Sequence, residues 1–251
     1  MNKIAKIIII VIIAVGIWLL KADLNQIARE DSEIGQVYYM VEANVAQNLY
    51  SHVDTGGSKL IALTFDDGPD PNFTPIVLEI LKQHQITATF FVVGQQAEQH
   101  PELIKKAIQQ GCEVENHTYT HPDVSKYNRL QIQDEIVKTH TLIEKITKQT
   151  PHYFRPPKKL YNTETMDVAE SLNYKMVLWG ICIENQRSKT ISDMAQRIID
   201  AAGPGVIILG HDGRLNRTRT MEALPQIIEG IQEKGYQFVT LDELFAAQGK
   251  Y

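Results

Sequence analysis

The sequence predicts an α/β protein: a distorted, roughly seven-stranded (β/α) barrel preceded by an N-terminal membrane segment. Strand-like and helix-like stretches alternate from Lys59 onward with little between them. Such alternation indicates a parallel sheet, and closure into a barrel is the usual arrangement at this size. Polar side chains lie at or just after the ends of several strands, which is typical of barrel active sites. Residues 7–20, by contrast, carry no charged side chain.

Residues 1–21 are predicted to be a signal anchor. The uncharged run of 14 residues, 7–20, is short for a membrane span, but Lys6 can snorkel and so lengthen it. Cleavage needs small residues at the A-x-A positions, and Leu20-Lys21-Ala22 offers one. An uncleaved, single-pass anchor is therefore favoured over a secreted product. Lys3 and Lys6 place the N-terminus in the cytoplasm and the remaining chain outside.

Residues 22–57 are polar and mixed in charge, and they predict a juxtamembrane tether that ends at Thr55-Gly56-Gly57-Ser58. Residues 58–251 then predict a single domain. The chain of 251 residues is long enough to bury one sizeable core. Its formal net charge of −5 argues against a nucleic-acid binder. Nothing in the sequence implies a protein partner.

The first predicted strand, residues 60–65, is nearly all apolar on both of its alternating faces, as expected of a strand buried on both sides. Six further strands are predicted at residues 88–93, 112–115, 152–155, 175–179, 206–209 and 237–239. Helices are predicted at residues 75–83, 102–110, 130–147, 163–172, 192–202, 219–234 and from Leu241 onward. Four aromatic residues are predicted to be barrel core rather than sugar platforms: Phe90, Phe91, Tyr153 and Trp179.

The first strand ends in two adjacent acids, Asp66 and Asp67. Two unpaired charges at the mouth of a core cost several kcal/mol unless a cation or hydrogen-bond donors compensate them. Gly68 is expected to permit a positive φ, and Pro69 fixes φ and removes a donor, so the strand must stop there.

A pair of histidines, His117 and His121, follows the predicted strand at residues 112–115. Two histidines four residues apart face the same way if the backbone makes one helical turn, which suits zinc. Together with one acid of the pair they supply two imidazoles and a carboxylate, and this set leaves a position for water. The remaining acid beside such a water is a general base by position.

Four segments, in this order, resemble the signature motifs of the polysaccharide deacetylases, the NodB-homology carbohydrate esterases of family 4. They are Thr64-Phe65-Asp66-Asp67-Gly68-Pro69, His117-Thr118-Tyr119-Thr120-His121, Phe154-Arg155-Pro156-Pro157 and Leu209-Gly210-His211-Asp212. The resemblance covers roughly residues 58–248. It implies that this region is a metal-dependent hydrolase that removes acetyl groups from N-acetylglucosamine-type sugars.

The resemblance also implies the role of individual residues. Asp67, His117 and His121 would hold the metal, for which zinc is the default, although cobalt or another divalent ion fits the same donors. Three residues would act on the substrate or on one another: Asp66 as base, Arg155 positioning Asp66, and His211 as acid. A backbone N–H near Lys158 would bind the oxyanion.

The chain departs from the family pattern at two places. Cys182 stands where the family usually continues into an Asp-containing motif, and Lys158-Lys159 replaces an aromatic or small residue followed by Gly. In related enzymes that Asp is thought to raise the pKa of the catalytic His. Glu184, two residues further on, could compensate for its loss. Cys182 and Cys112 are predicted at opposite ends of the barrel, so no disulfide is expected between them.

The expected function is N-deacetylation of a glycan outside the cytoplasmic membrane, with peptidoglycan as the substrate. Two alternatives remain open: a non-catalytic glycan-binding relative that keeps the fold, and a metal-dependent esterase acting on O-acetyl groups. Glycan binding without metal-dependent acetate release would favour the non-catalytic relative. Faster turnover of an O-acetylated than of an N-acetylated sugar would favour the esterase.

Overall fold

The structure, a computed structural model, describes residues 48–184 and 188–248. The predicted anchor and the tether up to residue 47 lie outside the described residues. Residues 48–57, predicted as the end of the tether, belong to the compact unit that begins at Asn48, and Val53 is buried within it. Across the described ranges, no helix is both long and apolar enough to cross a membrane.

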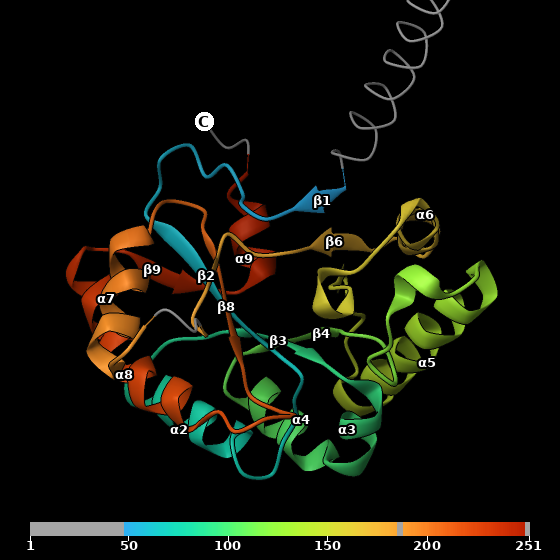
Figure 1. Cartoon of the computed structure of the whole chain (residues 1–251), viewed down its shortest axis with the longest axis horizontal. Coiled ribbons are helices and arrows are strands. Elements are labelled where there is room, and N and C mark those ends of the chain that lie inside the picture. Colours follow the sequence, from blue (N-terminus) through green and yellow to red (C-terminus); the bar gives the residue numbers. More distant parts are fainter. Residues whose placement is uncertain (1–47, 185–187, 249–251) are drawn as a thin grey trace, which may run out of the picture. The chain divides into compact units, whose positions relative to one another are not determined.

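A curled, parallel β-sheet forms the centre of the unit (Figure 1). Its strands are β1 (Leu49–Tyr50), β2 (Leu60–Asp66), β3 (Thr89–Val92), β4 (Glu113–Asn116), β5 (Tyr153–Phe154), β6 (Lys175–Val177), β7 (Ile181–Cys182), β8 (Ile207–His211) and β9 (Gln237–Val239). The order is β1-β6-β5-β4-β3-β2-β8-β7, and β9 also pairs with β2. All seven predicted strands are present, and β1 and β7 are additional.

The prediction of a barrel is confirmed only as a curled parallel sheet, because β1 and β7 end the ladder without pairing with each other. Residues 178–180 separate β6, which pairs with β5, from β7, which pairs with β8. Within this short segment the N–H of Leu178 donates to Tyr50 O at 2.6 Å, and the N–H of Gly180 donates to Ile207 O at 3.0 Å. Between β6 and β7 the chain therefore changes from hydrogen bonding with β1 to hydrogen bonding with β8, and no continuous ladder of strand pairs closes the sheet.

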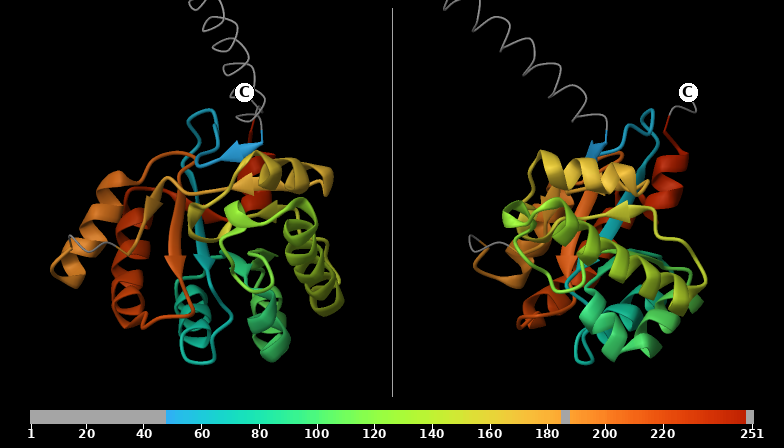
Figure 2. Two further views of the ribbon diagram at one scale, coloured as in Figure 1. Left: turned by 45° about the vertical axis from the view of Figure 1, so that its right-hand side comes forward. Right: turned by 90° about the vertical axis from the view of Figure 1, so that its right-hand side faces the viewer.

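The helices lie around the outside of the sheet (Figure 2). They are α2 (Thr74–Gln83), α3 (Gly94–Gln99), α4 (Pro101–Gln109), α5 (Arg129–Thr147), α6 (Thr163–Ser171), α7 (Ile191–Ala201), α8 (Thr218–Glu233) and α9 (Leu241–Ala246). Capping boxes at Asn128, Asn162, Thr190 and Thr240 begin α5, α6, α7 and α9. The short helix α3 is the one helix among these that the sequence analysis did not predict.

Strand β2 lies between β3 and β8 in the sheet and carries the first pair of acids at its end. Residues 61–65 are wholly buried, so the prediction of a strand buried on both faces is confirmed. Phe90, Phe91 and Tyr153 are core residues, as predicted. Trp179 differs: it is half-buried and lines a pocket at the carboxyl end of the strands, so its assignment to the core was wrong in part.

Candidate active site

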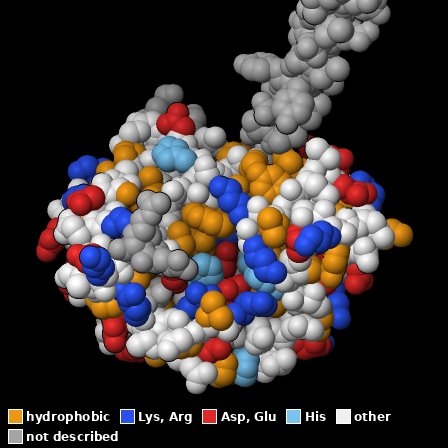
Figure 3. All heavy atoms as spheres, viewed as in Figure 1, with side chains coloured by type: hydrophobic (Ala, Val, Ile, Leu, Met, Phe, Trp, Pro, Cys, Tyr) orange, Lys and Arg blue, Asp and Glu red, His pale blue; other side chains and the backbone are white. Residues whose placement is uncertain are grey.

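A pocket of about 670 Å³ opens where the carboxyl ends of β2, β4 and β8 meet. Five of the six predicted site residues line it: Asp66, Asp67, His117, His121 and His211. The sixth, Arg155, is wholly buried behind them. In the space-filling view, acidic and histidine side chains lie within a hollow that basic side chains surround (Figure 3). The strand ends therefore bring together residues from four separate segments of the chain.

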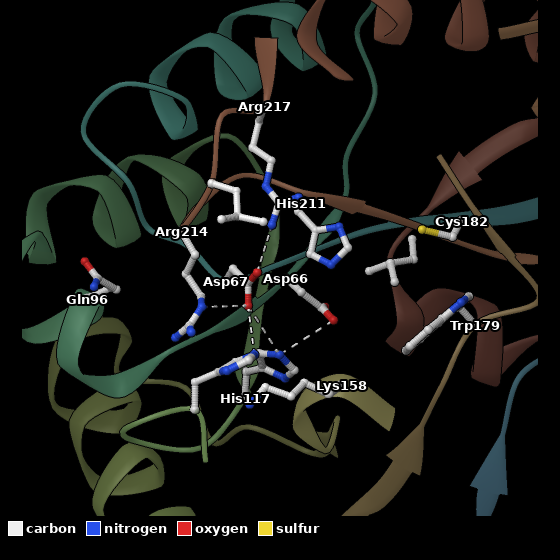
Figure 4. Close-up of a pocket in the computed structure, with 13 residues that line it drawn as sticks. Asp66, Asp67, Gln96, His117, Lys158, Trp179, Cys182, His211, Arg214 and Arg217 are labelled. Carbon is white, nitrogen blue, oxygen red and sulfur yellow. Dashed lines mark hydrogen bonds and ion pairs between the residues drawn. The ribbon is translucent and has the colours of Figure 1, made fainter. Parts of the chain in front are cut away.

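The turn at the end of β2 places both acids in this pocket (Figure 4). Successive side chains of a strand point to opposite faces, but Asp67 adopts φ 77°, in the left-handed region that non-glycine residues rarely enter. This breaks the alternation, and each carboxylate has an oxygen within 3.8 Å of His117 Nε2. The expectation that Gly68 supplies the positive φ was wrong. Gly68 serves a different need, because a Cβ there would lie 2.4 Å from the carboxylate of Asp212.

The two histidines converge without the helical turn that the sequence analysis assumed. They lie in a loop after β4 in which His121 has φ 60° and Thr118 has φ 67°. Glu135 of α5 holds this loop by accepting hydrogen bonds from the N–H groups of Tyr119 and Thr120 at 2.8 and 2.7 Å. The imidazole rings end up with their centroids 5.1 Å apart. The geometry that favours a shared ion is thus reached by a strained loop rather than a helix.

Asp67, His117 and His121 form a donor set that fits a divalent metal ion. Asp67 Oδ1 lies 3.1 Å from His121 Nε2 and 3.8 Å from His117 Nε2. These separations are close to the roughly 3.4 Å expected between ligands that each lie about 2.1 Å from a tetrahedral zinc. His117 Nδ1 donates to Arg155 O at 2.7 Å, which leaves the lone pair on Nε2, facing the acids.

The protonation states of this set also suit a metal. Burial by itself raises the pKa of Asp67, but the hydrogen bond with His121 and the nearby imidazoles outweigh it and lower the pKa to about 2. Burial lowers the pKa of His117 in spite of the two acids beside it. A carboxylate and a neutral imidazole are the forms that bind a cation.

Arg155 fixes the position of Asp66. Its Nη1 donates to Asp66 Oδ1 at 2.7 Å and to Thr64 Oγ1 at 2.9 Å. Its Nε and Nη2 donate to the carbonyls of Val177 and Leu178, each at 2.9 Å, where the chain leaves β6. Each of the three guanidinium nitrogens thus donates a hydrogen bond, and because Nη1 occupies Oδ1, the other oxygen of Asp66 is left toward the pocket.

Arg217, at the start of α8, is a functional candidate that the sequence analysis missed. Its Nη2 lies 3.0 Å from Asp67 Oδ2, its Nε donates to Gly213 O at 2.8 Å, and the residue is 8% exposed. Because Arg217 holds Oδ2, Oδ1 is the oxygen of Asp67 that faces His117 and His121. An arginine just before a predicted helix carries no sequence signal for this contact.

His211, at the end of β8, is paired with Glu184 rather than with Cys182. Its Nδ1 lies 3.0 Å from Glu184 Oε2, and Glu184 Oε1 accepts hydrogen bonds from the His211 N–H and from Thr220 Oγ1. Burial lowers the pKa of His211, but the hydrogen bond with Glu184 and its charge outweigh burial and raise the pKa. The structure thus places at His211 the carboxylate that the sequence analysis considered as compensation for Cys182.

Replacing Glu184 with Gln is expected to move the alkaline limb of the pH profile of kcat/KM for acetate release to lower pH. A general acid must start protonated, and without the carboxylate His211 loses its proton at lower pH. The profile is measured between pH 5 and 10, with Glu222→Gln as the control, since Glu222 is an exposed carboxylate on α8. An unchanged alkaline limb in Glu184→Gln would show that His211 is not the acid, or that another group tunes it.

Comparisons with known proteins identify the family of this chain. A family model described as polysaccharide deacetylase matches residues 54–177. A peptidoglycan-N-acetylglucosamine deacetylase of Bacillus cereus is 35% identical over 188 residues, which cover 74% of this chain and 88% of the relative.

Two solved structures have a similar fold. The crystal structure of the peptidoglycan N-acetylglucosamine deacetylase Bc1960 matches with a TM-score of 0.77 and 30% identity, over 81% of this chain and 96% of that chain. A CE4 family pseudoenzyme from Bacillus anthracis matches with a TM-score of 0.70 and 29% identity, over 76% of this chain and 66% of that chain. The chain therefore belongs to the polysaccharide deacetylase family, as its four motifs predicted.

Proposed function

We propose that this chain is a metal-dependent deacetylase that hydrolyses the N-acetyl groups of an N-acetylglucosamine-containing glycan outside the cytoplasm, and that the glycan is peptidoglycan. One observation carries the proposal. The two adjacent acids have separate partners, Arg155 on Asp66 and Arg217 on Asp67, so one is free to act as base while the other faces the two imidazoles. The relatives that are named peptidoglycan deacetylases support the choice of substrate.

Asp67, His117 and His121 would hold the metal, and zinc is proposed because two imidazoles and one carboxylate are a common catalytic zinc set. When bound, the ion would polarise the acetyl carbonyl and make the attacking water more acidic. Cobalt or another divalent ion is compatible with the same three donors.

The remaining steps belong to side chains of the chain itself. Asp66 accepts the proton of the attacking water at Oδ2, since Arg155 occupies Oδ1. His211 then donates a proton from Nε2 to the leaving amine, because its Nδ1 faces Glu184. The backbone near Lys158, which lines the pocket, is proposed to bind the oxyanion. The half-buried indole of Trp179 offers an apolar wall beside these groups.

The proposed location is the outer side of the cytoplasmic membrane, with residues 1–21 as an uncleaved anchor. The uncharged run at residues 7–20 and the lysines before it support this arrangement. Recovery of a mature N-terminus beyond Leu20 by mass spectrometry would contradict the anchor and indicate a secreted protein instead.

Acetate release from a panel of acetylated glycans is expected to require metal. The panel includes peptidoglycan fragments, N-acetylglucosamine oligomers and O-acetylated sugars. Chelation is expected to abolish release from the N-acetylated members, and zinc or cobalt to restore it.

Two outcomes would replace the proposal. Glycan binding without acetate release under any metal condition would identify a non-catalytic relative; one solved structure of similar fold is described as a pseudoenzyme. Faster turnover of O-acetylated than of N-acetylated sugars would identify an esterase.

A further inference from the structure

A second group of metal-ligating side chains lies beside the proposed active site. The Cys182 thiol, the Glu184 carboxylate and a ring nitrogen of His211 all lie within 4.8 Å of one another. Cys182 belongs to β7 and pairs in register with Leu209 of the neighbouring strand β8, which ends at His211. We propose that Cys182, Glu184 and His211 form a second metal site, that it takes zinc, and that its occupation inhibits the enzyme.

Two of the three distances within this group are close to those between ligands of a single ion, and the third, between Cys182 and His211, is within 4.8 Å. Glu184 Oε2 lies 3.5 Å from Cys182 Sγ and 3.0 Å from His211 Nδ1. Ligands of a tetrahedral zinc with bonds of about 2.0 to 2.3 Å are separated by roughly 3.3 to 3.8 Å. The other oxygen, Oε1, is held by Thr220 Oγ1 at 2.7 Å and by the His211 N–H at 3.1 Å, so Oε2 is directed toward the thiol and the ring.

The chemistry of the donors selects the type of ion. A thiolate, an imidazole and a carboxylate suit zinc, whereas magnesium and calcium prefer oxygen ligands alone. The proposed catalytic set, Asp67, His117 and His121, contains no sulfur, so the two sites differ in their ligands. Cys182 and His211 both line the pocket, and all three ligands are half-buried, so an ion can reach them from solvent.

Binding at this site releases protons. A cysteine thiol carries its proton near neutral pH, so the sulfur of Cys182 must lose it in order to bind the ion. The ion displaces this proton from Sγ and, from a protonated His211 ring, the proton on Nδ1, and both pass to solvent. The ring keeps one proton, on Nε2, and the sulfur and Nδ1 each form a bond to the ion.

Occupation of the site disables the general acid. A His211 ring whose Nδ1 is bound to a cation still carries the Nε2 proton, but donating it would leave an imidazolate, so the bound ring is a much weaker acid than the imidazolium that protonates the leaving amine. This inhibition rests on the function proposed above, whereas the existence of the second site does not. Excess zinc is therefore expected to act at two places, filling the first site to activate and the second to inhibit.

Cobalt(II) is the probe that tests the site independently of activity, because a cobalt–thiolate bond gives a charge-transfer band in the near ultraviolet. The metal-free protein is titrated with cobalt, and bound ions are counted after dialysis. We expect two ions per chain and a charge-transfer band. In Cys182→Ala we expect one ion and no band.

Cys112→Ala is the matched control, since Cys112 is the other cysteine of the chain and lies buried before β4. It should keep both ions and the band. His121→Ala, which removes a ligand of the first site, should keep the band. A single ion without a band in the unaltered protein, or a band that persists in Cys182→Ala, would overturn the proposal.

Zinc inhibition tests the consequence. Acetate release by the unaltered protein should fall once zinc exceeds one equivalent. Changes to residues that only hold metal ligands in place typically weaken metal binding by roughly 10- to 100-fold. Because Cys182 is proposed to be a ligand itself, inhibition of Cys182→Ala should need a still larger increase in free zinc. The activity of each protein is expressed relative to its own maximum. Equal zinc sensitivity of the two proteins would overturn the inhibitory role. Absence of acetate release from both would count against the proposed function alone, and the cobalt result would still decide the site.

Discussion

Asp66→Asn is expected to keep the bound metal and to lower kcat/KM for acetate release by about 10²- to 10⁴-fold, the usual effect of losing a general base. The amide oxygen of Asn can still accept the hydrogen bond that Arg155 Nη1 makes to Asp66 Oδ1. The amide nitrogen at the other position cannot accept a proton from water. The fold and the metal site are thus retained while one chemical step is lost, and kinetics and metal content are measured on the same preparations.

Asp67→Asn is the matched comparison, because it changes the neighbouring residue by the same atoms. Asp67 Oδ1 lies within 3.8 Å of the Nε2 atoms of both His117 and His121. Asp66 makes one such ion pair, from its Oδ2 to His117 Nε2 at 3.7 Å. Asp67→Asn should therefore lose metal and activity together. Loss of metal in Asp66→Asn with retention in Asp67→Asn would show that the two roles are exchanged.

The regular elements could be predicted from the sequence because each carries a local signal. Seven strands follow from short apolar runs bounded by polar residues, and the longer helices from stretches with regular spacing. Strands β1 and β7, each of two residues, are too short to show a periodicity, and β5, of the same length, is predicted only as part of a longer run at residues 152–155. At residues 178–180 the chain changes its hydrogen-bond partner from Tyr50 to Ile207, and both partners are distant in the sequence. Local patterns do not contain such partners.

The candidate site also contains residues that could be predicted from the sequence and residues that could not. The motifs name the side chains that face the pocket and one residue that holds them, Arg155, but they do not name the other residues that hold the site in place. Arg217 contacts Asp67 across 150 residues, and Glu135 contacts the histidine loop from α5. The positive φ of Asp67 and that of His121 could not be predicted either, since non-glycine residues rarely adopt this conformation. Tertiary contacts impose this conformation, and as a result both acids lie within 3.8 Å of His117 Nε2.

The second large effect is expected from the histidine pair. His117→Ala and His121→Ala should each lose the bound metal, and with it acetate release by about 10³-fold or more, because the ion is proposed to supply several kcal/mol of transition-state stabilisation. Metal content by mass spectrometry and acetate release are measured together. His152→Ala is the control, since His152 is exposed and lies outside the pocket. It should keep both metal and activity.

The two variants should differ in the stability of the metal-free protein. His117 Nδ1 donates to the carbonyl of Arg155, a wholly buried residue, so His117→Ala leaves that oxygen without this donor and should lower the free energy of unfolding by about 1 to 3 kcal/mol. His121 Nδ1 has no hydrogen-bond partner within the described residues, and Asp67 keeps Arg217 when His121 is removed. His121→Ala should therefore cost less. Urea unfolding of both metal-free variants measures the difference, and full metal content in either variant would show that the ligands are misassigned.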